Sequence, residues 1–207
     1  RKWRVAGQLD RFKQIRKKFD DAGLNLFAYV MTFAEDFPDE EIDAVFQQAR
    51  ALGVGIIGTN QTTVGMGPKL APYAEKYKID LSFHNHSKVE DSNEVASLAS
   101  FDKLFAMSKR FKANLDCGHF VGGNNDPVAF ISQHHDRITH LHMKDRKRDN
   151  GPNMPWGEGQ TPLKEVLKLI KDKHYPIYAI IEYEYKGTGT PIEEVKKCMD
   201  YMRQALA

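Results

Sequence analysis

The chain has 207 residues, which is enough for one domain with a sizeable hydrophobic core. Its 30 Lys and Arg residues nearly balance its 28 Asp and Glu residues, and the formal net charge of +2 gives no bias toward nucleic acid or a membrane surface. No stretch approaches the roughly 20 apolar residues of a membrane-spanning helix. We therefore expect neither a nucleic-acid nor a membrane partner.

Neither the first residues of the chain nor its two cysteines identify the cellular compartment. The chain starts with Arg1-Lys2-Trp3-Arg4 and not with Met, so we expect the true amino terminus to lie upstream. The cytoplasm is then the default compartment, and export stays open. Cys117 and Cys198 form no recognisable disulfide framework, so we expect reduced, partly buried thiols.

Helical and strand patterns alternate along the chain. Apolar residues at three- and four-residue spacing mark the helices, and short apolar runs bounded by Gly or Pro mark the strands. In chain order, the predicted elements are a helix over 9–22, a strand over 24–31, a helix over 38–52, a strand over 54–58, a helix over 68–77, a strand over 79–83, a helix over 98–111, a strand over 113–115, a helix over 127–135, a strand over 138–143, a polar loop over 144–160, a helix over 162–173, a strand over 177–183 and a helix over 191–205.

This alternation is typical of parallel β/α units and predicts an α/β fold. The sequence shows six strands, whereas a closed (β/α)8 barrel needs eight and about 250 residues. The pattern leaves two folds open, a doubly wound open sheet and a barrel without two of its units. Since no repeat or low-complexity linker divides the chain, we expect residues 1–207 to form a single domain.

Four successive strands end in side chains that can bind a metal. Residues two apart on a strand share a face, so the pattern pairs His84 with His86, His140 with His142, and Glu182 with Glu184; Asp116 ends the strand between the two histidine pairs. In a barrel, the inward members of these pairs converge at the carboxyl ends of the strands. Two histidines with two carboxylates would suit Mn, Zn, Co or Fe, and an all-carboxylate site would favour Mg.

Each of these residues also has a plain structural interpretation. A histidine near a strand end is commonly a hydrogen-bonded structural group, and Asp116 before Cys117-Gly118 is able to cap a turn. Glu182 is harder to explain, because an unpaired carboxylate is costly to bury in an apolar run. Lys144 is either part of an exposed ion pair or a cation that neutralises an anionic intermediate. The segment 154–159 is either an ordinary turn or a loop that folds over the site.

These motifs together resemble the sugar phosphate isomerase/epimerase superfamily, the xylose isomerase-like TIM barrels. The resemblance extends from Gly23 onward and rests on four steps in family order: Leu-Asp-Cys-Gly-His, His-Leu-His-Met-Lys-Asp, Trp-Gly-Glu-Gly and Ile-Glu-Tyr-Glu. In such enzymes these motifs belong to the fifth to eighth strands. The resemblance therefore implies a (β/α)8 TIM-type barrel that lacks its first two β/α units in this chain.

The resemblance also implies the site residues. Asp116, His142 and Glu182 match the family's metal ligands, and His119 matches a histidine near the substrate oxygens. His84 stands where the family usually has a glutamate ligand, so His84 is the fourth candidate ligand and, with His86, a candidate proton-transfer group. The remaining candidate substrate-binding residues are Lys144, Trp156 and Glu158.

The chemistry that the resemblance implies is proton abstraction next to a carbonyl, through a metal-stabilised enediolate. Glu182 would be ligand and base, and His84 or His86 would return the proton. We expect a divalent ion (Mn, Zn, Co or Mg) and a small carbohydrate or polyol substrate, acted on by an isomerase or epimerase. A related sugar or inosose dehydratase, a lyase, is the alternative.

Other functions stay open. A non-catalytic carbohydrate-binding relative is compatible with His84 in the glutamate position. An AP endonuclease, which would bind damaged DNA, is disfavoured by the near-neutral charge and by the missing Asp-x-His step between Asp145 and Gln160. The sequence lacks a Gly-rich phosphate-binding loop, which favours unphosphorylated sugars or inositol-like polyols. A homo-oligomer is neither required nor excluded.

Overall fold

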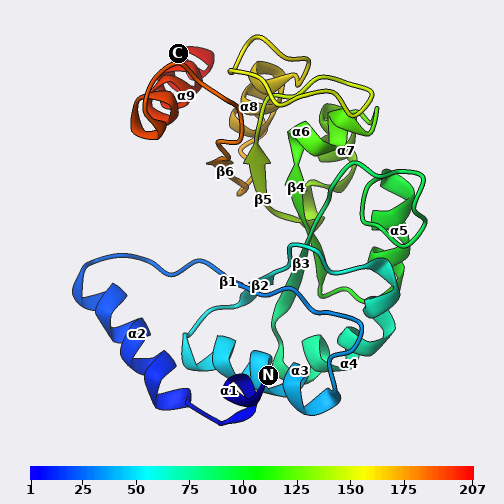
Figure 1. Cartoon of the computed structure of the whole chain (residues 1–207), viewed down its shortest axis with the longest axis vertical. Helices are drawn as coiled ribbons and strands as arrows, with labels where there is room; N and C mark the ends of the chain where they lie inside the picture. Colours follow the sequence, from blue (N-terminus) through cyan, green and yellow to red (C-terminus); the bar gives the residue numbers. More distant parts are fainter. The chain divides into compact units, whose positions relative to one another are not determined.

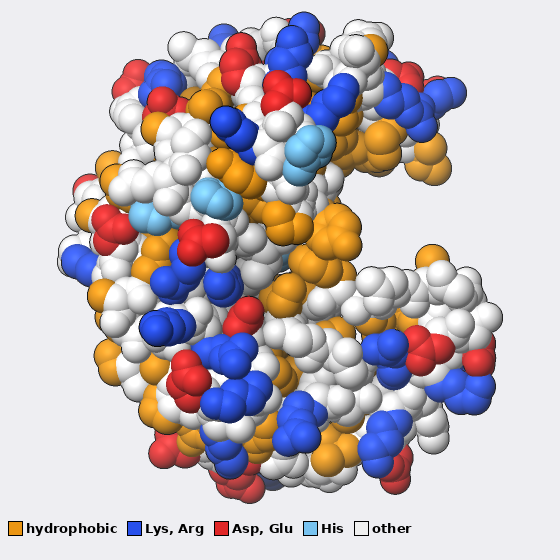
Figure 2. All heavy atoms as spheres, turned by 180° about the vertical axis from the view of Figure 1, so that it is seen from behind, with side chains coloured by type: hydrophobic (Ala, Val, Ile, Leu, Met, Phe, Trp, Pro, Cys, Tyr) orange, Lys and Arg blue, Asp and Glu red, His pale blue; other side chains and the backbone are white.

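The computed structural model describes all residues from Arg1 to Ala207. Their contacts group into two compact units, each described by itself: the first is Arg1–His84 with Asp102–Lys112, and the second is Asn85–Phe101 with Ala113–Ala207. None of the helices combines the length and the apolar character needed to cross a bilayer. Acidic and basic side chains are interspersed on the face shown in Figure 2, as the balanced composition leads one to expect.

The first unit contains three parallel strands in chain order and the helices that cover them (Figure 1). Its elements are α1 (Lys2–Val5), α2 (Leu9–Asp21), β1 (Tyr29–Val30), α3 (Asp39–Ala51), β2 (Ile56–Gly58), the 3-10 turn η1 (Val64–Met66), α4 (Gly67–Tyr77) and β3 (Asp80–His84). Helix α3 packs against α1, α2 and α4, and Phe46 contributes a buried ring that stacks on Tyr73 and Tyr77.

The chain passes between the units in α5 (Leu98–Met107) and β4 (Phe111–Asp116). The second unit continues with α6 (Cys117–Gly122), α7 (Pro127–His134), the 3-10 turn η2 (His135–Arg137), β5 (Ile138–Met143), α8 (Leu163–Asp172), β6 (Tyr178–Ile181) and α9 (Pro191–Leu206). Strands β4, β5 and β6 are parallel neighbours in that order. Helix α8 lies against α7 and α9 (Figure 1).

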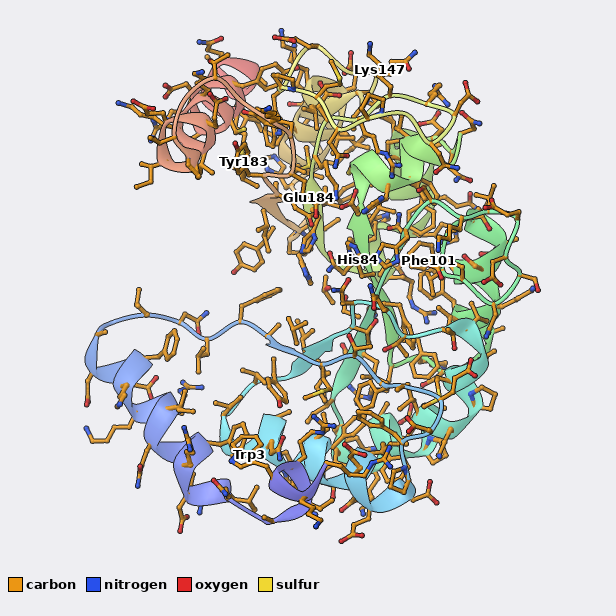
Figure 3. All side chains as sticks on the ribbon, viewed as in Figure 1. Trp3, His84, Phe101, Lys147, Tyr183 and Glu184 are labelled. Carbon is orange, nitrogen blue, oxygen red and sulfur yellow. The ribbon has the colours of Figure 1, made fainter.

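Local sequence explains where the helices of the second unit begin. Thr190 and Glu193 form a reciprocal capping box at the start of α9, and Pro191 occupies the first helical position, where no backbone donor is needed. Asp126 accepts from the N–H groups of Val128 and Ala129 and so caps α7. The rings of Phe101 (labelled in Figure 3), Phe120 and Phe130 then pack on one another and form part of the core.

The predicted alternation and the six parallel strands are confirmed, but several boundaries differ. Instead of a strand over 24–31, only Tyr29–Val30 forms a ladder, and Leu24 is 57% exposed. The helix predicted over 98–111 ends at Met107, because Ser108 begins a turn that leads into β4. Helix α6 was not predicted, since six residues are too few to show a period. β6 has one strand neighbour, so Tyr178 is exposed and not core.

Candidate functional site

Asp116 is the last residue of β4 and is completely buried. Its Oδ1 accepts a hydrogen bond from the His119 N–H at 2.6 Å, so the side chain caps the N-terminus of α6. Its Oδ2 faces the Lys144 ammonium at 3.1 Å. The capping role that the sequence offered for Asp116 is therefore present and uses Oδ1, while the predicted role as a metal ligand would use Oδ2.

Asn85 fixes the backbone of Asp116. Its Oδ1 accepts from the Asp116 N–H at 2.8 Å, and its Nδ2 donates to the Asp116 carbonyl at 3.1 Å. Asn85 is fully buried. The side-chain amide therefore pairs with both backbone groups of Asp116, as a neighbouring strand would, and limits the directions in which the Asp116 carboxylate can point.

His142 and Glu182 reach the same place because of the strand register. Asp116 lies opposite His142 in the β4–β5 ladder, and His142 lies opposite Ile180 in the β5–β6 ladder. Glu182 follows two residues after Ile180, on the same face. Its Oε2 lies 3.1 Å from His142 Nδ1, so that nitrogen donates and Nε2, 3.3 Å from the Asn114 amide, carries the lone pair.

Lys144 lies at the centre of this group. The residue is 1% exposed, and its Nζ lies 3.1 Å from Asp116 Oδ2, 3.3 Å from Glu182 Oε2 and 2.6 Å from Glu184 Oε2. Glu184, labelled in Figure 3, follows β6 and is half-exposed. One buried ammonium thus holds three carboxylates from the ends of β4 and β6.

Two carboxylates and the ammonium of this cluster have shifted pKa values. Burial raises the pKa of Asp116, and its hydrogen bond with Glu182 raises it further, while the Lys144 ammonium opposes both. Burial also acts to raise the pKa of Glu182, but His142, Asp116 and Lys144 together hold it well below its usual range. Burial likewise acts to lower the pKa of Lys144, but the three carboxylates raise it, so the ammonium stays charged.

A pair of histidines lies beside Asp116. The rings of His86 and His119 meet edge to face with centroids 5.1 Å apart. His86 Nδ1 lies 2.8 Å from the Glu94 carboxylate, which can only accept, so Nδ1 carries the proton. His119 Nδ1 lies 2.6 Å from Arg146 Nη1, which can only donate, so in His119 the proton is on Nε2. The Nε2 atoms of the two rings therefore differ: Nε2 of His86 is an acceptor and Nε2 of His119 is a donor.

The loop 154–160 is tied down by one buried side chain. The Asp145 carboxylate accepts from the N–H groups of Gly157, Gly159 and Thr161 at 2.8, 2.9 and 3.1 Å. Trp156 then meets Tyr201 of α9 edge on, with ring centroids 5.8 Å apart. Trp156 and Glu158 line a cavity of about 530 Å³ that also involves Tyr185, Glu194 and Tyr201.

The predicted site residues therefore do not all lie together. Asp116, His142, Lys144 and Glu182 form one cluster, and His86 and His119 form a pair at its side, whereas Trp156 and Glu158 line the cavity at α9. His84 is the buried last residue of β3, in the first unit, and its backbone N–H points to Thr59 Oγ1 at 3.4 Å. Its roles as ligand and proton-transfer group stay predictions.

The residues of the cluster fit a divalent metal. Asp116 Oδ2 is buried and lies beside the Lys144 ammonium and the Glu182 carboxylate, so its surroundings already favour a positively charged partner. One ligand atom of Asp116 lies within 4.8 Å of one of His142, and mixed nitrogen and carboxylate donors suit Mn, Zn, Co or Fe. The predicted metal is therefore compatible with the residues present.

Three further polar residues belong to this region although the motifs did not single out their roles. Glu184 contacts Lys144, Asn85 holds Asp116, and Arg146 orients His119. Glu184 was noted as sharing a face with Glu182, and that alternation was the signal that could have identified it. Arg146 and Asn85 act through contacts far apart in sequence, which no local pattern shows.

Comparison with known proteins gives the family. The model of the family described as "Xylose isomerase-like TIM barrel" matches residues 68–205. An inosose dehydratase of Lacticaseibacillus casei is 25% identical over 154 residues, which cover 65% of this chain and 50% of that protein. The chain therefore spans about half the length of the curated relatives it matches.

Solved structures show the same fold. A xylose isomerase domain protein from Alicyclobacillus acidocaldarius has a TM-score of 0.72 at 14% identity, covering 97% of this chain and 85% of that one. A sugar phosphate isomerase/epimerase from Parabacteroides distasonis has a TM-score of 0.68 at 19% identity, covering 92% and 76%. The α/β fold with six parallel strands and the resemblance drawn from the motifs are thereby confirmed. The chain belongs to the xylose isomerase-like TIM barrel family.

Proposed function

We propose that this chain carries the metal-binding part of an enzyme that abstracts a proton next to a carbonyl of a small carbohydrate or polyol, as isomerases and epimerases do. The observation that supports this most is the cluster of Asp116, His142 and Glu182 around one buried ammonium at adjacent strand ends. The family and its sugar-modifying members agree with this class of substrate.

In this proposal Asp116, His142 and Glu182 hold the ion, and the role of His84 as fourth ligand stays a prediction. A divalent ion bound there would act as a Lewis acid and stabilise negative charge on substrate oxygens. Lys144, positively charged and buried, would place a second positive charge beside the same oxygens. A homo-oligomer and the single domain over residues 1–207 remain predictions.

Two groups are able to move the proton. His142, Asp116 and Lys144 keep Glu182 ionised at neutral pH, so its carboxylate is able to accept a proton, although the lowered pKa makes it a weaker base than a free glutamate. His86 accepts at Nε2 and His119 donates from Nε2, so the histidine pair offers a base and an acid side by side. Return of the proton to the same carbon is epimerisation, and return to the neighbouring carbon is isomerisation.

A dehydratase is the second candidate, and two observations favour it. The curated relative named above is an inosose dehydratase. Loss of a hydroxyl from the carbon one further along needs an acid to protonate the departing oxygen, and His119, with its Nε2–H oriented by Arg146, is a suitable acid. The same cluster would serve both reactions, and the acid distinguishes them.

The first test is metal content. We expect the purified protein to retain one divalent ion after dialysis, and Asp116→Ala and His142→Ala to lose it, as measured by inductively coupled plasma mass spectrometry. Asn60→Ala, at an exposed position, is the control and should keep the metal. Full retention in both ligand variants would exclude the proposed site.

The second test separates the reactions. Incubation in deuterated water with a panel of ketoses should introduce deuterium next to the carbonyl if the enzyme is an isomerase or epimerase. Incubation with inosose should instead produce an enone with ultraviolet absorption if it is a dehydratase. Metal binding without exchange and without enone would favour the carbohydrate-binding alternative.

A further inference from the structure

We propose that Glu184 is a positioning residue that holds the Lys144 ammonium, so that Asp116 and Glu182 can accept a divalent cation while Lys144 stays charged beside it. This inference rests on the proposed metal site. It assigns a role to a carboxylate outside the expected ligand set.

The geometry gives Glu184 the closest of the three contacts to Lys144. Its Oε2 lies 2.6 Å from Nζ, compared with 3.1 Å for Asp116 Oδ2 and 3.3 Å for Glu182 Oε2. The same oxygen of Glu184 also accepts from Asn153 Nδ2 at 3.3 Å, which connects the end of β6 to the loop after β5. Two contacts within the protein therefore hold the Glu184 carboxylate.

The three carboxylates differ in their exposure to solvent, which indicates different roles. The Asp116 side chain is fully buried and the Glu182 side chain is 24% exposed, whereas the Glu184 side chain is 45% exposed. Asp116 and Glu182 also adjoin His142, the nitrogen donor, through the register and through a direct contact. Glu184 contacts Lys144 and the loop, so it is placed to retain the ammonium and not to complete the ligand set.

A count of charges explains why a third carboxylate is useful. Once Asp116 is ionised, as a carboxylate must be to bind a metal, Asp116, Glu182 and Glu184 supply three negative charges and Lys144 one positive charge, which leaves two negative charges. A divalent cation neutralises this remainder. Without Glu184 the loaded cluster would carry one net positive charge, and the ammonium would repel the ion. Asp116 and Glu182 also contact Lys144, so we expect the metal-free protein to fold without the Glu184 carboxylate.

The test is the affinity for Mn²⁺, measured by isothermal titration calorimetry with wild type, Glu184→Gln, Lys144→Met and the double variant. We expect Glu184→Gln to weaken Mn²⁺ binding by about 10- to 100-fold, the range for the loss of a residue that supports metal ligands. Lys144→Met should bind at least as tightly as wild type. The double variant should return to near wild-type affinity, because its loaded cluster is again neutral.

The matched control is Glu90→Gln, which removes one negative charge from an exposed turn of the same unit and should leave the affinity unchanged. Glu184→Asp, which keeps the charge on a shorter side chain, should fall between wild type and Glu184→Gln. A Glu184→Gln affinity within twofold of wild type would overturn the inference. So would an equal loss in the Lys144→Met background, since a purely structural role of Glu184 would not depend on Lys144.

The two proposals fail in different ways. If wild type binds Mn²⁺ through Asp116 and His142 but Glu184→Gln binds equally well, the metal site stands and the role of Glu184 falls. If wild type binds no Mn²⁺, Zn²⁺ or Co²⁺, the proposed function falls and the inference falls with it.

Discussion

Asn85 holds both backbone groups of Asp116, accepting from its N–H at 2.8 Å and donating to its carbonyl at 3.1 Å. Asn85 is the first residue after the predicted ligand His84, and Asp116 is the predicted ligand of the next strand. The site is therefore built from backbone pairing as well as from the side chains that face it.

Replacing Asn85 with Ala should weaken both folding and metal binding. The change leaves two buried backbone groups of Asp116 unpaired, so we expect the free energy of unfolding to fall by about 2–4 kcal/mol. Metal affinity should fall by about tenfold, because the Asp116 carboxylate loses its fixed direction. Denaturant unfolding and Mn²⁺ titration measure the two effects. Asn60→Ala should change neither, and an unchanged Asn85→Ala protein would refute the argument.

Gly118 is predicted to tolerate no side chain. A Cβ at this position would lie 2.7 Å from the Lys144 carbonyl oxygen and 2.9 Å from Lys144 Cγ, so the start of α6 or the end of β5 would have to move. We expect Gly118→Ala to lower the free energy of unfolding by about 1–3 kcal/mol. The control is Gly55→Ala, where a Cβ meets nothing within 4 Å and thermal unfolding should stay within a few degrees of wild type. Equal effects in the two variants would contradict the packing argument.

Removal of the Asp145 carboxylate should free the loop 154–160. Asp145→Ala takes the acceptor from three backbone donors, each of which costs about 1–3 kcal/mol if it stays buried and unpaired. We expect amide hydrogen exchange of Gly157, Gly159 and Thr161 to accelerate at least tenfold, while β5 keeps its protection. Asp172→Ala, at an exposed position of α8, serves as the control. Unchanged exchange in the loop would show that other contacts hold it.

Glu194 should give the protein an acid-sensitive stability. Hydrogen bonds from Lys197, the Gly189 N–H and the Tyr185 hydroxyl lower the pKa of Glu194 from 4.5 to about 2, although burial opposes the shift. A lowered folded-state pKa contributes stability above pH 4.5 that is lost as the pH falls toward 2. Glu194→Gln should therefore lower Tm at pH 7 and lose less Tm than wild type between pH 5 and pH 3. If the two proteins lose the same Tm, Glu194 is not the group responsible.

The sequence predicted the fold through its apolar periodicity. Six strands alternating with helices, the start of α9 at Pro191 and the strand Ile138–Met143 follow from patterns within single elements. The prediction of a strand over 24–31 was wrong in extent because a ladder needs a partner, and within this segment only Tyr29 and Val30 pair with β2. A short apolar run does not show how many of its residues will pair with a neighbouring strand.

The candidate site, like the fold, could be predicted from the sequence only in part. Polar residues at strand ends identified Asp116, His142 and Glu182, because strand ends in parallel units meet at one edge. The resemblance made Trp156 and Glu158 substrate-binding candidates; these residues line the cavity at α9, where hydrogen bonds to Asp145 hold the loop, and their role stays a prediction. The position of a loop depends on hydrogen bonds between segments, and no repeating pattern in the sequence predicts such bonds.

The sequence by itself determined the order of strands and helices, the near-neutral surface and the residues that stand at the ends of β4, β5 and β6. Those features depend on neighbours along the chain. Only the tertiary structure decided that one ammonium, Lys144 Nζ, lies among Asp116, Glu182 and Glu184, that Asn85 pairs with the Asp116 backbone, and that His86 and His119 carry their protons on different nitrogens. Most of these contacts depend on the register between strands and on burial, which bring together groups about 27 to 40 residues apart; the exception is His86, whose partner Glu94 is eight residues along the chain.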